Sequence, residues 1–223
     1  MVKPKVRVIT ADFGDHISNY NYQLPHQITK KYEVEYICYT DQNTSSRLLS
    51  LHPRLKSKIP KMLDWVENSA DYYIWFDSKF KIRSNTLVDD VIDSLGDYDI
   101  QIFKHPQRKS IKSEIDFLED EMLRLNNNYL IDRYKGERIR SQYEFYVQDT
   151  NFIDNNFFSM GFFVYSKNLI KNRDYNLLTD WFFHNCYWSI QDQISFPYLL
   201  HKHKTKYRTF DYQLFNNKYL KWG

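Results

Sequence analysis

YYIWF, residues 72–76, is followed directly by Asp77 in the stretch that decides the fold of this chain. Five consecutive aromatic or β-branched residues are long enough for a buried strand and too short for most helices. Asp77 is therefore expected at the carboxyl end of a strand, which is where open α/β sheets bind their ligands. A carboxylate there is costly to bury unless it meets a cation, a metal or a hydrogen-bond donor, so Asp77 is a candidate ligand residue. The alternative is an aspartate that only opens a turn or caps the next element.

The segments around this strand alternate between strand and helix patterns. Further strands are expected at residues 6–10, 34–39, 98–103, 157–165 and 207–210, and helical segments at residues 26–32, 55–68, 86–95, 110–125, 129–146, 177–188 and 192–201. Pro60 places the start of the helix at 55–68 late, and Gly161 interrupts the strand at 157–165, as glycine often does where a ligand or backbone approaches closely. This alternation predicts βαβ units and a mostly parallel sheet flanked by helices. With no internal repeat and no linker-like segment, we expect one α/β domain over residues 1–223.

The composition excludes several classes of protein. With 31 basic and 28 acidic residues, the net charge of +3 is too small to indicate nucleic acid, and acidic residues interleave with the basic ones. Cys38 and Cys186 lie in apolar contexts, so we expect buried free thiols and a reducing compartment. No signal peptide or membrane-spanning stretch is present, which predicts a soluble, cytoplasmic protein.

Motifs for several common cofactors are missing from the sequence. The five glycines form neither G-x-G-x-x-G nor a P-loop, which argues against hydride transfer and P-loop ATP hydrolysis. The two cysteines do not have the spacing of a zinc site. The 19 tyrosines, 16 phenylalanines and 5 tryptophans serve mainly as core, but aromatic rings also stack on bases and sugar faces.

Polar residues elsewhere offer further candidates, each with a structural alternative. His105 and Arg108 follow the strand at 98–103, at the same sheet edge as Asp77, and suit either an anion or a simple loop. The Asp192-Gln193 pair could clamp sugar hydroxyls, although Asp192 also suits a helix cap. His201 and His203 could bind a metal, or they could complement the dipole at the end of a solvated helix.

Taken in order, these motifs resemble a known family. They comprise Lys61, Tyr73–Asp77, Phe103–Arg108, Glu114, Trp181 and Asp192–Pro197. In this order and spacing they are similar to the DUF616 type of glycosyltransferase-like protein and, more broadly, to GT-A glycosyltransferases, which bind nucleotide-diphosphate sugars. The chain also resembles the N-terminal glycosyltransferase domains of chlorovirus proteins that build the capsid glycan. Further domains of a longer polypeptide and a host-cytoplasmic location would accompany that closer likeness.

The resemblance implies an activity and roles for individual residues. It implies a hexosyltransferase that moves a sugar, with rhamnose or glucose as candidates, from a UDP-sugar to a glycan or glycoprotein acceptor, such as a viral capsid N-glycan, with retention. A nucleotide-binding half would cover about residues 1–105 and an acceptor half about residues 106–223. Residues expected at the nucleoside are Thr10, Ala11, Asp12, Tyr39 and Thr40, and those expected at the phosphates are Lys61, His105 and Arg108.

A divalent metal, Mn²⁺ or Mg²⁺, is also implied, because it would stabilise the diphosphate leaving group. Asp77 would then begin the acidic metal-binding motif, with His201 and His203 as further ligands. GT-A enzymes usually carry Asp-x-Asp here, whereas this chain has Lys79 at the third position. Either one carboxylate with histidine or water ligands holds the metal, or Lys79 partly replaces the metal in binding the donor. Asp192 would act as general base if the enzyme inverts, and would orient the sugar, with Gln193, if it retains.

Two other functions stay open at this point. One is a carbohydrate- or nucleotide-binding module without catalysis, whose metal motif has degenerated. The other is a nucleotidyltransferase, although residues 11–15 are acidic where such an enzyme ordinarily needs a basic, glycine-rich loop.

Overall fold

A computed structural model describes residues 2–14, 24–45, 48, 50–215 and 217–222 of the chain. Its main sheet has six strands in the order β2-β1-β3-β6-β5-β7. The strands are β1 (Lys5–Asp12), β2 (Glu33–Thr40), β3 (Tyr72–Phe76), β5 (Ile100–Lys104), β6 (Phe158–Ser166) and β7 (Tyr207–Thr209). All are parallel except β6, which runs antiparallel to both of its neighbours. The six expected strands and the mostly parallel α/β sheet are therefore confirmed.

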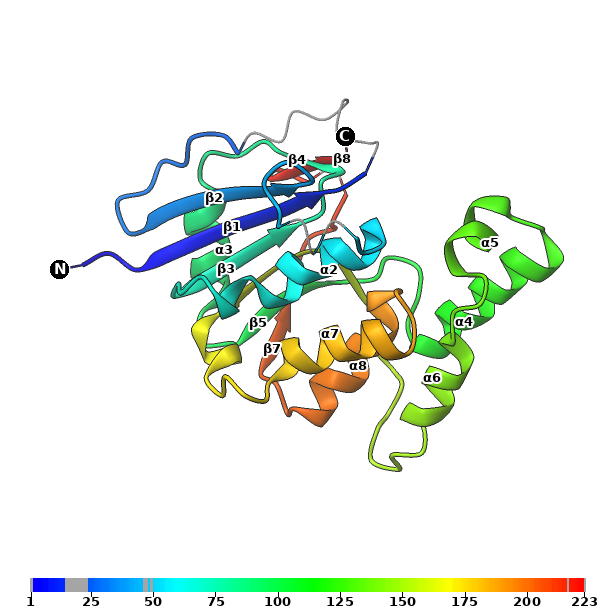
Figure 1. The fold of residues 1–223 in the computed structure, drawn as a ribbon. Coiled ribbons are helices and arrows are strands. Elements are labelled where there is room, and N and C mark those ends of the chain that lie inside the picture. Colours follow the sequence, from blue (N-terminus) through cyan, green and yellow to red (C-terminus); the bar gives the residue numbers. More distant parts are fainter. Residues whose placement is uncertain (1, 15–23, 46–47, 49, 216, 223) are drawn as a thin grey trace.

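Helices cover both faces of this sheet (Figure 1). One face carries α2 (Pro53–Leu63), α7 (Leu177–Tyr187) and α8 (Asp192–Lys202), and the other carries α3 (Leu87–Leu95). Three further helices, α4 (Ile111–Glu119), α5 (Asn128–Tyr134) and α6 (Ile139–Tyr146), stand together beyond one edge of the sheet (Figure 1). Alternate strand residues point to opposite faces, so Val6 and Val8 pack with α3 residues, whereas Ile9 and Ala11 pack on the α2 side.

Short elements complete the fold. A two-stranded sheet joins β4 (Phe80–Ile82) to β8 (Leu220–Trp222). Single 3₁₀ or π turns lie at η2 (Asp64–Val66), η3 (Asp120–Arg124) and η4 (Lys167–Ile170). In the described part of the chain, no helix is both long enough and apolar enough to cross a membrane.

Three expectations about helices are wrong. Residues 26–32 form no helix, because Gln27 ties this segment to the loop before α3 through Ser84 O and to the first turn of α3 through Val88 N. The helix with Pro60 starts early, at Pro53, where His52 caps it and proline fits the first turn, so Pro60 lies inside the helix. The segment 129–146 is two helices, broken at Gly136, whose positive φ of 84° ends helical geometry.

The expectation about strand β6 is confirmed in part, and the one about the cysteines needs correction. Strand β6 is continuous from Phe158 to Ser166, but its pairing with β5 shifts register at Gly161, because Ile102 pairs with Phe163 and Phe103 with Ser159, so that residues 160–162 of β6 are left out of this pairing. Both cysteines are free as expected, but Cys186 is exposed and Cys38 is only half-buried. Cys186 lies on the outer side of α7, where its apolar sequence neighbours do not cover it.

Candidate active site

Asp77 follows β3 at the carboxyl edge of the sheet, as the sequence predicts. Its Oδ1 accepts a hydrogen bond from Trp75 Nε1 at 2.9 Å and lies 3.5 Å from Lys61 Nζ. Its Oδ2 lies 3.4 Å from Lys79 Nζ. The side chain keeps 29% of its surface exposed, so Asp77 is anchored by protein groups and still reachable by a ligand.

A second carboxylate meets the first through Lys61. Asp192, at the start of α8, lies 2.7 Å from Lys61 Nζ and 2.5 Å from Lys58 Nζ, in both cases through Oδ2. The backbone carbonyl of Asp192 accepts a hydrogen bond from Trp181 Nε1 at 2.8 Å, which fixes the beginning of α8 against α7. Lys61, only 4% exposed, therefore links the strand-end aspartate to the helix-start aspartate.

Both lysines belong to one stripe of α2. Residues 54, 58 and 61 are spaced four and three apart, so Arg54, Lys58 and Lys61 share a helix face. Arg54 donates to the carbonyl of Arg133 on α5 at 2.6 Å. A cavity of about 550 Å³ opens at the Arg54 end of this helix face and is lined by Arg54 and Arg133. The face with Arg54, Lys58 and Lys61 thus runs from Asp77 to a polar cavity large enough for a sugar.

The charges in this cluster shift one another. Burial would raise the pKa of Asp192, but the ammonium groups of Lys58 and Lys61 hold it well below its usual range. Asp77 likewise has a lowered pKa, because Lys61 and Lys79 outweigh its burial. Burial lowers the pKa of Lys58 to about 8 despite Asp192, whereas the two aspartates keep the pKa of Lys61 raised. Both carboxylates are therefore ionised at neutral pH and held by cations.

Asp192 should make the protein sensitive to acid. A carboxyl group whose folded pKa is lowered stabilises the fold above its unfolded pKa of about 3.9, and that contribution is lost as pH falls through this value toward the folded pKa. We expect the free energy of unfolding to fall less between pH 6 and pH 3 in Asp192→Asn than in the wild type, measured by urea denaturation. Asp93→Asn, which changes an exposed aspartate paired with Lys31, should lose as much unfolding free energy between pH 6 and pH 3 as the wild type does. The same loss in Asp192→Asn would show that the contacts of Asp192 with Lys58 and Lys61 do not make the fold sensitive to acid.

Gly161 leaves room for Asp77. Its carbonyl accepts from Asp77 N at 2.8 Å, and a Cβ added at Gly161 would lie 2.8 Å from a ring carbon of Phe80 and 3.3 Å from Asp77 Oδ2. The close approach that Gly161 was expected to allow is thus made by the side chains of Phe80 and Asp77.

We expect Gly161→Ala to destabilise the fold by about 1–3 kcal/mol through overpacking, measured by urea denaturation. Adding Phe80→Leu should recover part of this loss if the clash is with the ring; no recovery would refute that cause.

The other residues expected at this edge form a separate network. Gln193 donates to the carbonyl of Phe158 at 2.8 Å, and its own carbonyl oxygen accepts from Gln191 at 3.2 Å. Gln191 also donates to Glu114, which pairs with Arg108 at 3.3 Å. Burial raises the pKa of Glu114. This network supports the start of α8, and neither Gln193 nor Arg108 contacts Asp77 in the structure.

His105 makes its hydrogen bonds within its own loop. Its Nδ1 accepts from the backbone N–H groups of Gln107 and Arg108, and its ring packs on Phe157. Burial, with Arg108 nearby, lowers the pKa of His105 to about 4, so the ring is neutral at physiological pH. A neutral ring engaged with the backbone shapes the loop and offers no positive charge to a phosphate.

The five residues expected at the nucleoside lie on two faces of the sheet. By strand alternation, Ala11 and Tyr39 face α2, whereas Thr10, Asp12 and Thr40 face the side of α3. Thr10 Oγ1 is buried and finds no hydrogen-bond partner among the described residues. The sequence places these five residues at the carboxyl ends of their strands. That position alone does not show on which face of the sheet each side chain lies.

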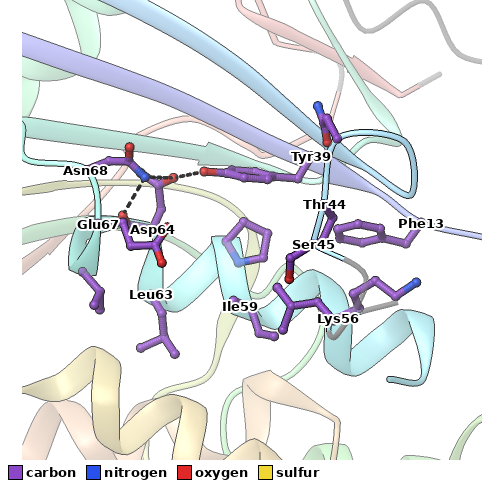
Figure 2. A pocket seen from close by; sticks show the side chains of 14 residues that line it. Phe13, Tyr39, Thr44, Ser45, Lys56, Ile59, Leu63, Asp64, Glu67 and Asn68 are labelled. Carbon is purple, nitrogen blue, oxygen red and sulfur yellow. Dashed lines mark hydrogen bonds between the residues drawn. The ribbon is translucent and has the colours of Figure 1, made fainter. Parts of the chain in front are cut away.

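A cavity of about 370 Å³ lies beside Tyr39 and Phe13 (Figure 2). Tyr39 donates to Asp64 at 2.6 Å, and Lys56 closes the cavity near Phe13. The α2 residues that line it are Lys56, Ile59, Pro60 and Leu63. At 100° per residue these lie on the opposite side of α2 from Lys58 and Lys61. Helix α2 therefore separates this cavity from the Asp77–Asp192 cluster.

The histidines expected as metal ligands are not brought to Asp77. His201 pairs with Asp149 at 3.1 Å and His203 with Asp180 at 2.9 Å. They lie at the far end of α8 from Asp192, about 14 Å along the helix for His201 and about 17 Å for His203. In the ranges that the structure describes, no three side chains of His, Cys, Asp or Glu gather as a metal site.

The side chains around Asp77 also do not suit a divalent cation. Its two oxygens face Lys61 and Lys79, and the nearest second carboxylate, Asp192, is held by two ammonium groups. Divalent cations of this kind prefer several oxygen ligands and are repelled by ammonium groups. The residues present therefore do not fit the manganese or magnesium ion that the resemblance implies.

Lys58 is the residue of this cluster that the sequence analysis missed. Its signal was available, because the 54, 58, 61 spacing places three cations on one face of a helix. Such a stripe more often faces solvent, and only the packing of α2 against α7 shows that it is enclosed.

The chain is similar to glycosyltransferase-like proteins in sequence and to solved proteins in fold. A family model described as TOD1/MUCI70, glycosyltransferase-like domain, matches residues 46–221. No curated protein sequence matches the chain. Among solved structures, A197 from STIV is 10% identical with a TM-score of 0.40, and the match covers 93% of this chain and 81% of that one.

Two solved glycosyltransferases match at similar levels. Mouse xyloside xylosyltransferase 1 in its apo form is 10% identical with a TM-score of 0.41, covering 80% of this chain and 63% of that chain. The glycosyltransferase GlyE of Streptococcus pneumoniae TIGR4 is 8% identical with a TM-score of 0.42, covering 95% of this chain and 46% of that chain. The chain thus spans less than two thirds of the length of either glycosyltransferase.

Proposed function

The chain belongs to the TOD1/MUCI70 glycosyltransferase-like domain family, and from this premise we propose that it transfers a sugar from a nucleotide-diphosphate donor to a glycan acceptor. The observation that carries the proposal is the convergence of Asp77, Asp192 and Lys61 at the carboxyl edge of the sheet. Open α/β sheets bind their ligands at this edge. A site that combines ionised carboxylates with buried ammonium groups suits a substrate that carries both hydroxyl and phosphate groups.

The roles follow from the charges. The lysines would bind the diphosphate and stabilise the negative charge that develops on it as the glycosidic bond breaks. Asp77 would hold Lys61 and Lys79 in place and face the sugar with its exposed surface. The cavity beside Arg54 and Arg133 would receive the acceptor, because it continues the same face of α2.

Asp192 fits an orienting role better than that of a general base. A general base works best with a pKa near the working pH, whereas two ammonium groups hold the pKa of Asp192 well below its usual range. Such a carboxylate accepts protons poorly. Its contacts therefore support the retaining alternative, in which Asp192 positions the sugar.

The finer features of the reaction stay predictions. They are the UDP carrier, rhamnose or glucose as the sugar, hexosyl transfer with retention, and the glycan of a viral capsid protein as acceptor. The division into a nucleotide-binding half and an acceptor half is a prediction of the same kind.

A donor screen tests the proposal. The whole chain is incubated with UDP-glucose, UDP-rhamnose and other nucleotide sugars, each with Mn²⁺ and with EDTA, and release of the nucleoside diphosphate is measured. We expect release above the buffer rate with at least one donor. If no donor is cleaved under either condition, with or without glycan acceptors, the alternative of a non-catalytic binding module is favoured, a function already suggested by Lys79 in place of a second aspartate.

A further inference from the structure

Three ammonium groups surround two carboxylates at the edge of the sheet. Lys58 and Lys61 contact Asp192, and Lys61 and Lys79 contact Asp77, all within 3.5 Å. These five side chains are called the lysine cluster below, and their summed charge is +1. A nucleoside diphosphate carries two to three negative charges, so the net positive charge of the cluster attracts it and offsets part of its charge before any cation is added.

The lysines of the cluster are placed to meet a ligand. Lys79 is 44% exposed, and its ammonium group lies 4.8 Å from the centre of the Trp222 ring on β8. Lys58 is 13% exposed and lies on the face of α2 that leads to the cavity beside Arg54. Lys61 lies beneath them, over the ring of Trp75. An incoming phosphate would reach Lys79 and Lys58 first and would be attracted by Lys61 behind them.

A divalent cation has no comparable place in this arrangement. It would have to displace Lys61 or Lys79 from Asp77, and the position where a second aspartate usually stands is Lys79 itself. Each ammonium group supplies charge and three hydrogen-bond donors, and needs no ligand shell of its own.

We propose that Lys58, Lys61 and Lys79 bind the diphosphate of the donor in place of a divalent metal ion, so that this site works without one. The inference rests on the proposed function, because it names how that site holds its substrate. It differs from the metal-dependent reaction that the resemblance implies, and the two give opposite results when metal is removed.

The first experiment measures UDP binding to the whole chain by calorimetry, in EDTA and in Mn²⁺. We expect dissociation constants that agree within about twofold. Lys58→Met should weaken binding in EDTA by roughly tenfold or more, as for loss of a hydrogen bond to a charged group. Lys202→Met is the matched control, since Lys202 pairs with Asp180 at the other end of α8, and it should bind as the wild type does.

Lys79→Asp is the sharper variant. It rebuilds Asp-x-Asp at residues 77–79, so it should bind UDP weakly in EDTA and regain affinity when Mn²⁺ is added. The melting temperature of each variant shows whether it is folded, and Lys79 is exposed enough for its replacement to be tolerated. The proposal is overturned if the wild type binds UDP only with Mn²⁺, if it binds UDP under neither condition, or if Lys58→Met and Lys202→Met bind alike.

The donor screen separates this proposal from the function itself. Cleavage of a nucleotide sugar only with Mn²⁺ would overturn the metal-free site and leave the glycosyltransferase standing. Metal-free binding of UDP without cleavage of any donor would support the lysine cluster and count against transfer.

Discussion

Asp77→Asn is expected to lower the rate of sugar transfer by about 100-fold or more while the fold stays intact. Asparagine has the same shape and its carbonyl oxygen can still accept the hydrogen bond from Trp75 Nε1. It removes the negative charge that Lys61 and Lys79 share, so Lys79 loses its anion and Lys61 is left with Asp192 alone to position it. The measurement is turnover of the best donor from the screen, with circular dichroism to follow folding.

Asp71→Asn is the matched control for this variant. Asp71 precedes β3 as Asp77 follows it, and it pairs with Lys167 at 2.7 Å at the opposite end of the strand. We expect near-wild-type turnover from Asp71→Asn. Near-wild-type turnover from Asp77→Asn as well would remove Asp77 from the site, whatever holds the diphosphate.

Trp181→Ala is expected to cost about 3–5 kcal/mol of unfolding free energy, the largest stability effect of the variants considered. The indole is fully buried between Phe163 and Phe196, with ring centres 5.6 and 4.7 Å away. Its removal opens a cavity between α7, α8 and the sheet and releases the carbonyl of Asp192. The measurement is the urea midpoint together with its slope.

Two further variants separate the contribution of buried apolar packing from that of the hydrogen bond between Trp181 and the carbonyl of Asp192. Phe183→Ala, on the exposed side of the same helix, should change stability by less than about 1 kcal/mol. Trp181→Phe keeps most of the apolar volume but loses the hydrogen bond to Asp192, so its cost should be smaller than that of Trp181→Ala. A cost for Trp181→Ala no greater than that for Phe183→Ala would show that α8 is not held by this contact.

Much of the fold could be predicted from the sequence. Residues 72–76 form a buried strand that ends at Asp77 as expected, and the short helix before Gly96 ends where that glycine indicates. The wrong expectations concern segments where a helix competes with another local structure, and the sequence does not show which of the two is more stable. At residues 26–32 the contacts of Gln27 with the loop before α3 replace a helix, and at Gly136 a backbone conformation that the apolar pattern does not reveal divides one expected helix into two.

The candidate site was predicted in part. Asp77, Lys61 and Asp192 were expected to share a site, and the structure joins all three. His201 and His203 were expected with them, but the length of α8 separates them from Asp77. Lys58 shares a helix face with Arg54 and Lys61 by its spacing in the sequence, but only the packing of α2 against α7 shows that this face is enclosed.

The sequence by itself determined the six strands of the main sheet and most of the helices, because the alternation of apolar side chains along a strand or helix is a local property of the chain. Tertiary structure alone decided the partners of the charges. Asp192 lies 134 residues from Lys58 and 131 from Lys61 in sequence, and they meet because α7 packs against both α2 and α8 over the sheet and so brings the start of α8 to the lysines of α2. An ammonium group is buried only where folding supplies a carboxylate, so the position of each charge follows from packing across the whole sheet, which no local pattern records.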